Sequence, residues 1–136
     1  MTELLADAFY YIALLNPSDR FHAAALQATQ TLTRPLVTSV WVLMEVADAL
    51  SAPAVRQRTA HFLQGVFADA NTVIVTDHVP WFARGLQLYA NRVDKSWTLT
   101  DCISFEIMTE RGIQEALTGD HHFVQAGFRA LLASKP

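Results

Sequence analysis

Short apolar runs alternate with longer helical segments along the whole chain, and this alternation limits the fold more than any other feature. The expected strands are residues 3–7, 34–38, 71–76, 113–118 and 128–133. The expected helices are residues 8–15, 18–32, 39–50, 53–68, 77–91, 100–112 and 120–125. Strands that alternate with helices predict a parallel sheet covered on both faces. We therefore expect one α/β domain over residues 1–136, with three layers around a short, mainly parallel sheet of four or five strands.

Prolines and small polar residues predict where several helices begin and end. We expect Pro53 in the first turn of one helix and Asp77 as the cap of the next. Either Thr100 or Asp101 should begin the helix that ends near Gly112, a glycine typical of helix C-termini.

Composition excludes several classes of protein. Hydrophobic residues make up 51% of the chain, which argues against disorder, and no apolar run approaches a membrane span. Glu3 and Asp7 replace the basic start of a signal peptide, and Cys102 is the single cysteine, so we expect a reducing cytoplasm and no disulfide within the chain. The net charge of -3 argues against binding nucleic acid through a broad basic surface, so a phosphate-bearing substrate would need metal ions.

Four acidic residues stand at the edges of apolar segments: Asp7, Glu45, Asp101 and Asp120. Burying a carboxylate without a partner is costly. In parallel α/β folds, ligands gather beyond the carboxyl ends of the strands, so the four acids are predicted to converge there. Carboxylates this close repel one another, so either some are protonated, with raised pKa values, or cations neutralise them. Hard divalent ions such as Mg²⁺ or Mn²⁺ prefer such oxygen ligands.

Each acid also has a simpler explanation on its own. Asp101 and Asp120 are suited to capping helices, and Asp7 to ending a strand. Glu45 would need an Arg or Lys partner, because its neighbours in the segment W-V-L-M-E-V-A are apolar. No nucleophile–histidine arrangement and no glycine-rich phosphate loop stands out in the chain.

The order of these motifs resembles the PIN-domain family, the metal-dependent nuclease fold of VapC-type toxins and of bacterial nucleic-acid-binding PIN proteins. The resemblance covers the whole chain. The matching segments are L-L-A-D-A-F-Y-Y-I-A-L-L, T-S-V-W-V-L-M-E and T-D-C-I-S-F-E-I-M-T-E-R-G-I-Q-E-A-L-T-G-D-H-H-F. It implies a PIN-like α/β/α sandwich and a metal site made of Asp7, Glu45, Asp101 and Asp120. Asp7 and Asp101 would bind the metal directly, Glu45 would bind it directly or through water, and Asp120 would complete the pocket or position the attacking water.

The resemblance also implies roles for residues around the acids. Thr118 would orient Asp120 through its hydroxyl group. Asp94 would border the site, and Lys95 and Arg92 would contact substrate phosphates, although all three also suit a solvated loop. The chain departs from the family at Phe9, where a small hydroxyl residue or glycine is frequent. His121 and His122 follow the last acid, where packing or capping explains them.

The implied function is a Mg²⁺- or Mn²⁺-dependent endoribonuclease, such as the toxin of a toxin–antitoxin pair with a small antitoxin partner, and commonly a homodimer. The alternative is a PIN-like module with a weakened site that binds nucleic acid or protein. A third reading makes Asp7 the nucleophile of a haloacid dehalogenase-like phosphatase. Proteins of that family have a D-x-D motif at this point. Here Phe9 occupies the position of the second aspartate, and no matching lysine motif is found.

Overall fold

The computed structural model describes residues 2–133 and contains one five-stranded sheet in which all neighbouring strands pair in parallel. The strands are β1 (Leu4–Ala6), β2 (Leu36–Thr38), β3 (Thr72–Ile74), β4 (Glu115–Leu117) and β5 (Arg129–Ala130). Their order across the sheet is β3-β2-β1-β4-β5. The expected α/β architecture and its parallel sheet are confirmed.

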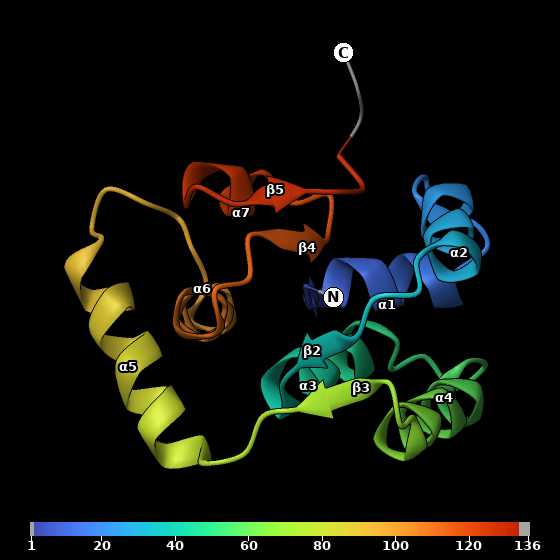
Figure 1. Ribbon diagram of the computed structural model, residues 1–136. Helices are drawn as coiled ribbons and strands as arrows, with labels where there is room; N and C mark the ends of the chain where they lie inside the picture. Colours follow the sequence, from blue (N-terminus) through green and yellow to red (C-terminus); the bar gives the residue numbers. More distant parts are fainter. Residues whose placement is uncertain (1, 134–136) are drawn as a thin grey trace.

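Helices precede or follow each strand of the described chain. They are α1 (Ala8–Leu15), α2 (His22–Thr31), α3 (Val40–Ala49), α4 (Arg56–Ala68), α5 (His78–Asn91), α6 (Leu99–Arg111) and α7 (His121–Gln125). The helices α1 to α4 lie on one side of the sheet, and α5, α6 and α7 lie on the other (Figure 1).

The side chains of β1 alternate between two hydrophobic cores, as the two-residue period of a strand requires. Leu4 and Ala6 are fully buried in the core beneath α1 to α4. Leu5 points the other way, into the core formed with α6 and α7. The central strand is therefore apolar on both faces, which explains why it reads as a continuous apolar run.

The second core depends on close contact between α5 and α6. A Cβ atom at Gly85 of α5 would overlap the Ile103 side chain of α6, so only glycine lets the two helices approach this closely. Cys102 is fully buried in the same core, as expected of a packing thiol, and burial raises the pKa of its thiol to about 11.

The sheet order places a topological switch point beside β1. The chain runs outward from β1 through β2 to β3, then returns to form β4 and β5 on the other side of β1. The carboxyl ends of β1 and β4 thus lie next to each other at the place where parallel α/β sheets bind ligands.

Two predicted helix starts were wrong, and a third was right in its position but not in its capping hydrogen bond. Pro53 lies in a turn before α4, which begins at Arg56. Asp77 precedes α5 but has a left-handed backbone (φ 58°) and makes no capping hydrogen bond through its side chain. The cap of α6 is Thr98, two residues before Thr100. The predicted end of α6 is confirmed, since Gly112 there has a left-handed backbone (φ 68°).

No helix in the part of the chain that the structure describes is both long and apolar enough to cross a membrane.

Candidate metal-binding site

The four predicted acids come together at the carboxyl edge of the sheet. Asp7 follows β1 directly, and Asp120 caps α7 just beyond β4. Glu45 lies on α3, and Asp101 lies in the first turn of α6. Asp7 is close enough to Asp101 and Glu45 for their charges to shift its pKa, and Asp120 acts on both Glu45 and Asp101 in the same way.

Asp7 is the most enclosed of the four, with 4% of its surface exposed. Burial raises the pKa of its carboxyl group to about 7, and the charges of Asp101 and Glu45 act in the same direction. A hydrogen bond of 2.7 Å from the Thr118 hydroxyl to Asp7 Oδ2 opposes this shift. The Asp7 carboxyl group therefore holds its proton to a higher pH than an ordinary aspartate does.

Asp101 is held by a reciprocal capping box at the start of α6. Its backbone N–H donates to Thr98 Oγ1 at 3.0 Å, and its Oδ2 atom accepts from the Thr98 N–H at 3.1 Å. Burial raises the pKa of the Asp101 carboxyl above its usual range, although the bonds from His122 and Thr98 lower it in part. The capping explanation of Asp101 is thus correct, but Asp101 also belongs to the acid cluster.

Asp120 is also both a cap and a member of the cluster. Its Oδ1 atom accepts a hydrogen bond of 2.9 Å from the His122 N–H at the start of α7. Its own N–H donates to Thr118 Oγ1 at 3.1 Å. The Thr118 hydroxyl therefore links Asp120 to Asp7, and it contacts both acids rather than Asp120 alone.

From the sequence, an Arg or Lys partner was the simpler explanation for Glu45, but the charged groups that act on it are acidic. Burial raises the pKa of its carboxyl group, and the charges of Asp101, Asp120 and Asp48 add to the effect. No salt bridge within residues 2–133 includes Glu45. The side chain is half-buried in an environment that a cation would stabilise.

The donor set fits a hard divalent cation. In Asp7, Asp101 and Asp120, one carboxylate oxygen is anchored by a hydrogen bond, which leaves the second oxygen for a metal ion. Asp7 is repelled by Asp101 and Glu45, and Asp120 repels Glu45 and Asp101, and carboxylate oxygens are the ligands that Mg²⁺ and Mn²⁺ prefer. Among the described residues, the group of three ligand atoms that lie within 4.8 Å of one another is Asp120, His121 and His122, so the four carboxylates are spread more widely and two imidazole rings border them.

No protein-family model matches the chain, and no curated protein matches it either. A solved structure does: VapC20 of Mycobacterium tuberculosis, described as a toxin that cleaves the sarcin–ricin loop. The two chains superpose with a TM-score of 0.82 at 23% sequence identity, over 92% of this chain and 95% of VapC20. The protein has the fold of a VapC toxin. The PIN-like sandwich expected from the sequence is therefore confirmed.

Asp94, which was predicted to border the site, contacts Arg92 and Lys95, which were predicted to bind substrate phosphates, in the loop before α6. Arg92 donates to both carboxylate oxygens of Asp94, at 3.1 and 3.2 Å, and stacks over the Trp97 ring. Lys95 Nζ lies 3.8 Å from Asp94 Oδ2. The loop ends at Thr98, so it leads to Asp101, but the contacts of Asp94 are with Arg92 and Lys95 rather than with the four acids.

Phe9, the residue that departs from the family pattern, lies against the segment that carries Asp120. Its ring is packed on Gly119 and makes an edge-to-face contact with Phe21, with 4.8 Å between the ring centroids. Tyr10 and Tyr11, in contrast, are buried in the core, as expected of aromatic residues at helical spacing.

The sequence reasoning missed two residues that hold the acids in place. Nδ1 of His122 forms a hydrogen bond of 3.0 Å with Asp101 Oδ2 and lies 3.6 Å from Asp120 Oδ1. Thr98 caps α6 through the box described above. The spacing T-x-x-D is a capping-box signature and would have found Thr98. His122 had no comparable signal, because its partner Asp101 lies 21 residues away in the chain.

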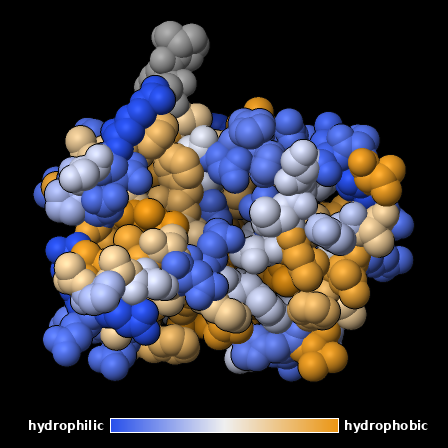
Figure 2. Space-filling model, turned by 180° about the vertical axis from the view of Figure 1, so that it is seen from behind, coloured by the Kyte–Doolittle hydropathy of each residue, from blue (hydrophilic) through white to orange (hydrophobic). Residues whose placement is uncertain are grey.

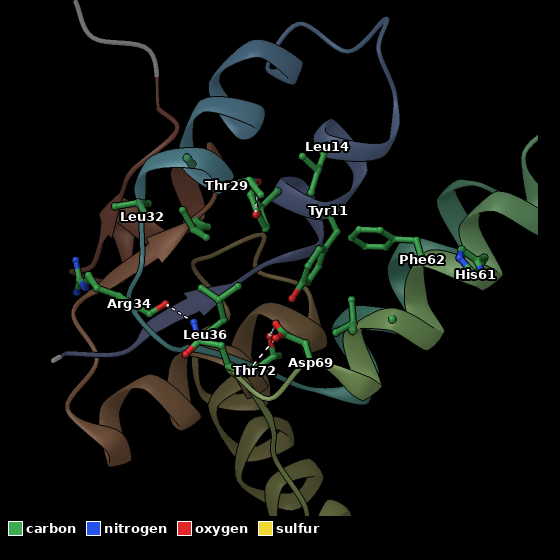
Figure 3. Close-up of a pocket in the computed structure, with 16 residues that line it drawn as sticks. Tyr11, Leu14, Thr29, Leu32, Arg34, Leu36, His61, Phe62, Asp69 and Thr72 are labelled. Carbon is green, nitrogen blue, oxygen red and sulfur yellow. Dashed lines mark hydrogen bonds between the residues drawn. The ribbon is translucent and has the colours of Figure 1, made fainter.

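A separate cavity of about 550 Å³ lies between α1, α2 and α4, and none of the four acids lines it. Among its lining residues, Tyr11 and Phe62 make an edge-to-face contact, with their ring centroids 5.7 Å apart (Figure 3). The Tyr11 hydroxyl is buried and has no hydrogen-bond partner among the described residues. The lining of the cavity is mainly apolar, with Arg34, His61 and Asp69 among its polar residues.

Proposed function

We propose that this protein is a Mg²⁺- or Mn²⁺-dependent endoribonuclease. The observation that carries the proposal is the convergence of Asp7, Glu45, Asp101 and Asp120, whose charges act on one another at the carboxyl edge of the sheet. A bound divalent ion would lower the pKa of a metal-bound water and stabilise the negative charge that develops on the phosphate during hydrolysis.

The proposed roles follow from how each carboxylate is held. Asp7 and Asp101 are the direct ligands, because both are buried and anchored through one oxygen. Glu45 binds the ion directly or through water, and Asp120 completes the pocket or positions the attacking water. Thr118 and His122 keep the acids oriented, since both hydrogen-bond to members of the cluster.

We propose RNA as the substrate because the fold is shared with VapC20, which is described as cleaving the sarcin–ricin loop. Because the proposed substrate is RNA, we also propose that the protein acts in the cytoplasm. Arg92 and Lys95 would contact phosphates next to the scissile bond. Both are now paired with Asp94, so this role requires the pairs to open or the phosphate to share them.

Two protein partners belong to the proposal. As the toxin of a toxin–antitoxin pair, the protein would be covered by a small antitoxin that places a basic side chain among the four carboxylates. As a homodimer, it would use the exposed apolar side chains of α5. Seen from behind, where α5 lies on the right, the molecular surface carries apolar patches on that side (Figure 2).

Cleavage of defined RNAs by metal-free protein, with Mg²⁺ or Mn²⁺ added back, tests the proposal. The substrates would be a mixed pool of structured and single-stranded RNA and an oligonucleotide that folds as the sarcin–ricin loop. Cleavage should depend on the added metal, stop with EDTA, and fall more than about a hundred-fold in Asp7→Asn and Asp101→Asn. Asp19→Asn, which changes an acid in the turn before α2, is the matched control and should cleave normally.

Equal cleavage by wild type and both cluster variants would point to a contaminating nuclease and refute the proposal. Mn²⁺ binding without cleavage of any RNA would instead identify a binding module with a weakened site.

A further inference from the structure

The Phe9 ring occupies the space that a side chain at Gly119 would need. A Cβ atom built on Gly119 would lie 2.5 Å from Cζ and 2.7 Å from Cε1 of Phe9. Real Cβ atoms do not approach other carbons this closely, so the ring lies directly over the glycine. Gly119 does not have a left-handed backbone, so an alanine there would not strain φ but would require the Phe9 ring to move.

This contact joins the two segments that carry Asp7 and Asp120. Phe9 lies two residues after Asp7, and Gly119 lies between Thr118 and Asp120. On one side, the segment is fixed by the Thr118 hydroxyl, which bonds to Asp7 Oδ2 and to the Asp120 N–H. On the other side, it is covered by the Phe9 ring, which is itself braced by Phe21.

We infer that Phe9 is a positioning residue that, with Gly119, holds Asp120 toward the other three carboxylates. A glycine next to Asp120 would otherwise leave this short connection free to adopt several conformations. The ring restricts it, so the large residue at position 9 acts through the backbone rather than through a bond to metal-bound water. The inference rests on the metal site proposed above.

Mn²⁺ affinity of a double-mutant cycle tests this role, because binding does not depend on turnover. The metal-free wild type, Gly119→Ala, Phe9→Ala and the double variant would be titrated with Mn²⁺ and followed by the electron spin resonance of the free ion. Each single variant should bind Mn²⁺ about ten-fold more weakly. The double variant should bind no more weakly than Phe9→Ala, because the added methyl group no longer meets a ring.

Gly65→Ala is the matched control, because a Cβ atom at that position of α4 meets nothing within 4 Å. It should leave Mn²⁺ affinity unchanged. If Gly119→Ala does not fold, Phe9→Ala and the milder Phe9→Leu still test the role, since both remove atoms and create no clash.

Urea unfolding of the same variants separates positioning from packing. The two substitutions could be coupled in the unfolding midpoint while Mn²⁺ affinity is unchanged in every variant. That result would overturn the inference and show that Phe9 and Gly119 form only a packing contact. Losses of affinity that simply multiply in the double variant would also overturn it. A wild type that binds no Mn²⁺ would overturn the proposed function, and the inference with it.

Discussion

Asp7 shows how one residue couples the stability of the fold to the proposed site. Burial raises the pKa of its carboxyl group from 3.8 to about 7 in the folded protein. Between these values the folded state binds a proton that the unfolded state does not, so folding is favoured by low pH. This contribution is fully present below about pH 4 and is lost as pH rises through about 7.

We therefore predict that the metal-free wild type loses stability from pH 5 to pH 8 relative to Asp7→Asn. The difference should reach at most a few kcal/mol, because one pKa unit corresponds to about 1.4 kcal/mol. Urea unfolding at both pH values measures it, and comparison with the variant removes the effects of other titrating groups. Saturating Mn²⁺ at pH 8 should raise the free energy of unfolding of the wild type but not that of Asp7→Asn. Parallel curves for the two proteins would contradict the prediction.

Residues such as Asp7 could be found from the sequence, but their partners could not. The four acids stood out because charged residues inside apolar segments are costly without a shared purpose. The bond from Thr118 to Asp7 spans 111 residues of chain, and no local pattern reports such a pair. The same holds for the contact of Phe9 with Gly119: the sequence marked Phe9 as a departure from the family, but it gave no sign that the ring packs on Gly119.

At the scale of elements, the start of α6 matters most for the site. Thr98 caps the helix and accepts from the backbone of Asp101, one of the proposed direct ligands. The sequence T-L-T-D offers two threonines, and Thr100 was the wrong choice. The capping box needs an acid three residues after the cap; Thr98 has Asp101 there, and Thr100 has Ile103. Helix propensity alone does not distinguish the two threonines, but this spacing does.

Thr98→Ala should lower the free energy of unfolding by about 1 kcal/mol, since it removes the N-cap side chain. It should also weaken Mn²⁺ binding, because Asp101 loses one of the contacts that fix it in the first turn of α6. Thermal unfolding and Mn²⁺ titration measure the two effects. Thr98→Ser keeps the hydroxyl group and should preserve both properties, so a Ser variant as weak as the Ala variant would argue against the capping box as the cause.

For the whole molecule, the alternation of strands and helices was enough to predict a parallel sheet and the edge of that sheet where the four acids lie. It was not enough to predict the order β3-β2-β1-β4-β5. That order depends on which way each crossover turns and on which helix faces bury best, both of which are decided by contacts between distant segments. Within that order, Asp7 and Asp120 follow neighbouring strands and so meet at the switch point.

The outer surface of α5 carries several large apolar side chains that are exposed to solvent. Val79, Phe82, Leu86 and Tyr89 of α5 are all more than 40% exposed, and they recur at spacings of three, four and three residues. This spacing places them along one face of the helix. Figure 1 shows α6 on the inner side of α5 and no element on its outer side. Such a stripe of apolar side chains marks a surface for association.

We predict that the protein dimerises through this stripe, so that sedimentation velocity at micromolar concentration gives twice the mass of the chain. Leu86→Glu places a charge at the centre of the stripe and should shift the protein to monomer, because burying an unpaired carboxylate in a self-complementary interface costs each subunit the same penalty. Gln87→Glu adds the same charge one position away, at an exposed site outside the stripe, and should remain dimeric.

Leu86→Glu should leave Mn²⁺ affinity intact, since the four acids lie on other elements of the fold. A wild type that is monomeric at every concentration, or a Leu86→Glu variant that still dimerises, would show that α5 is not the interface.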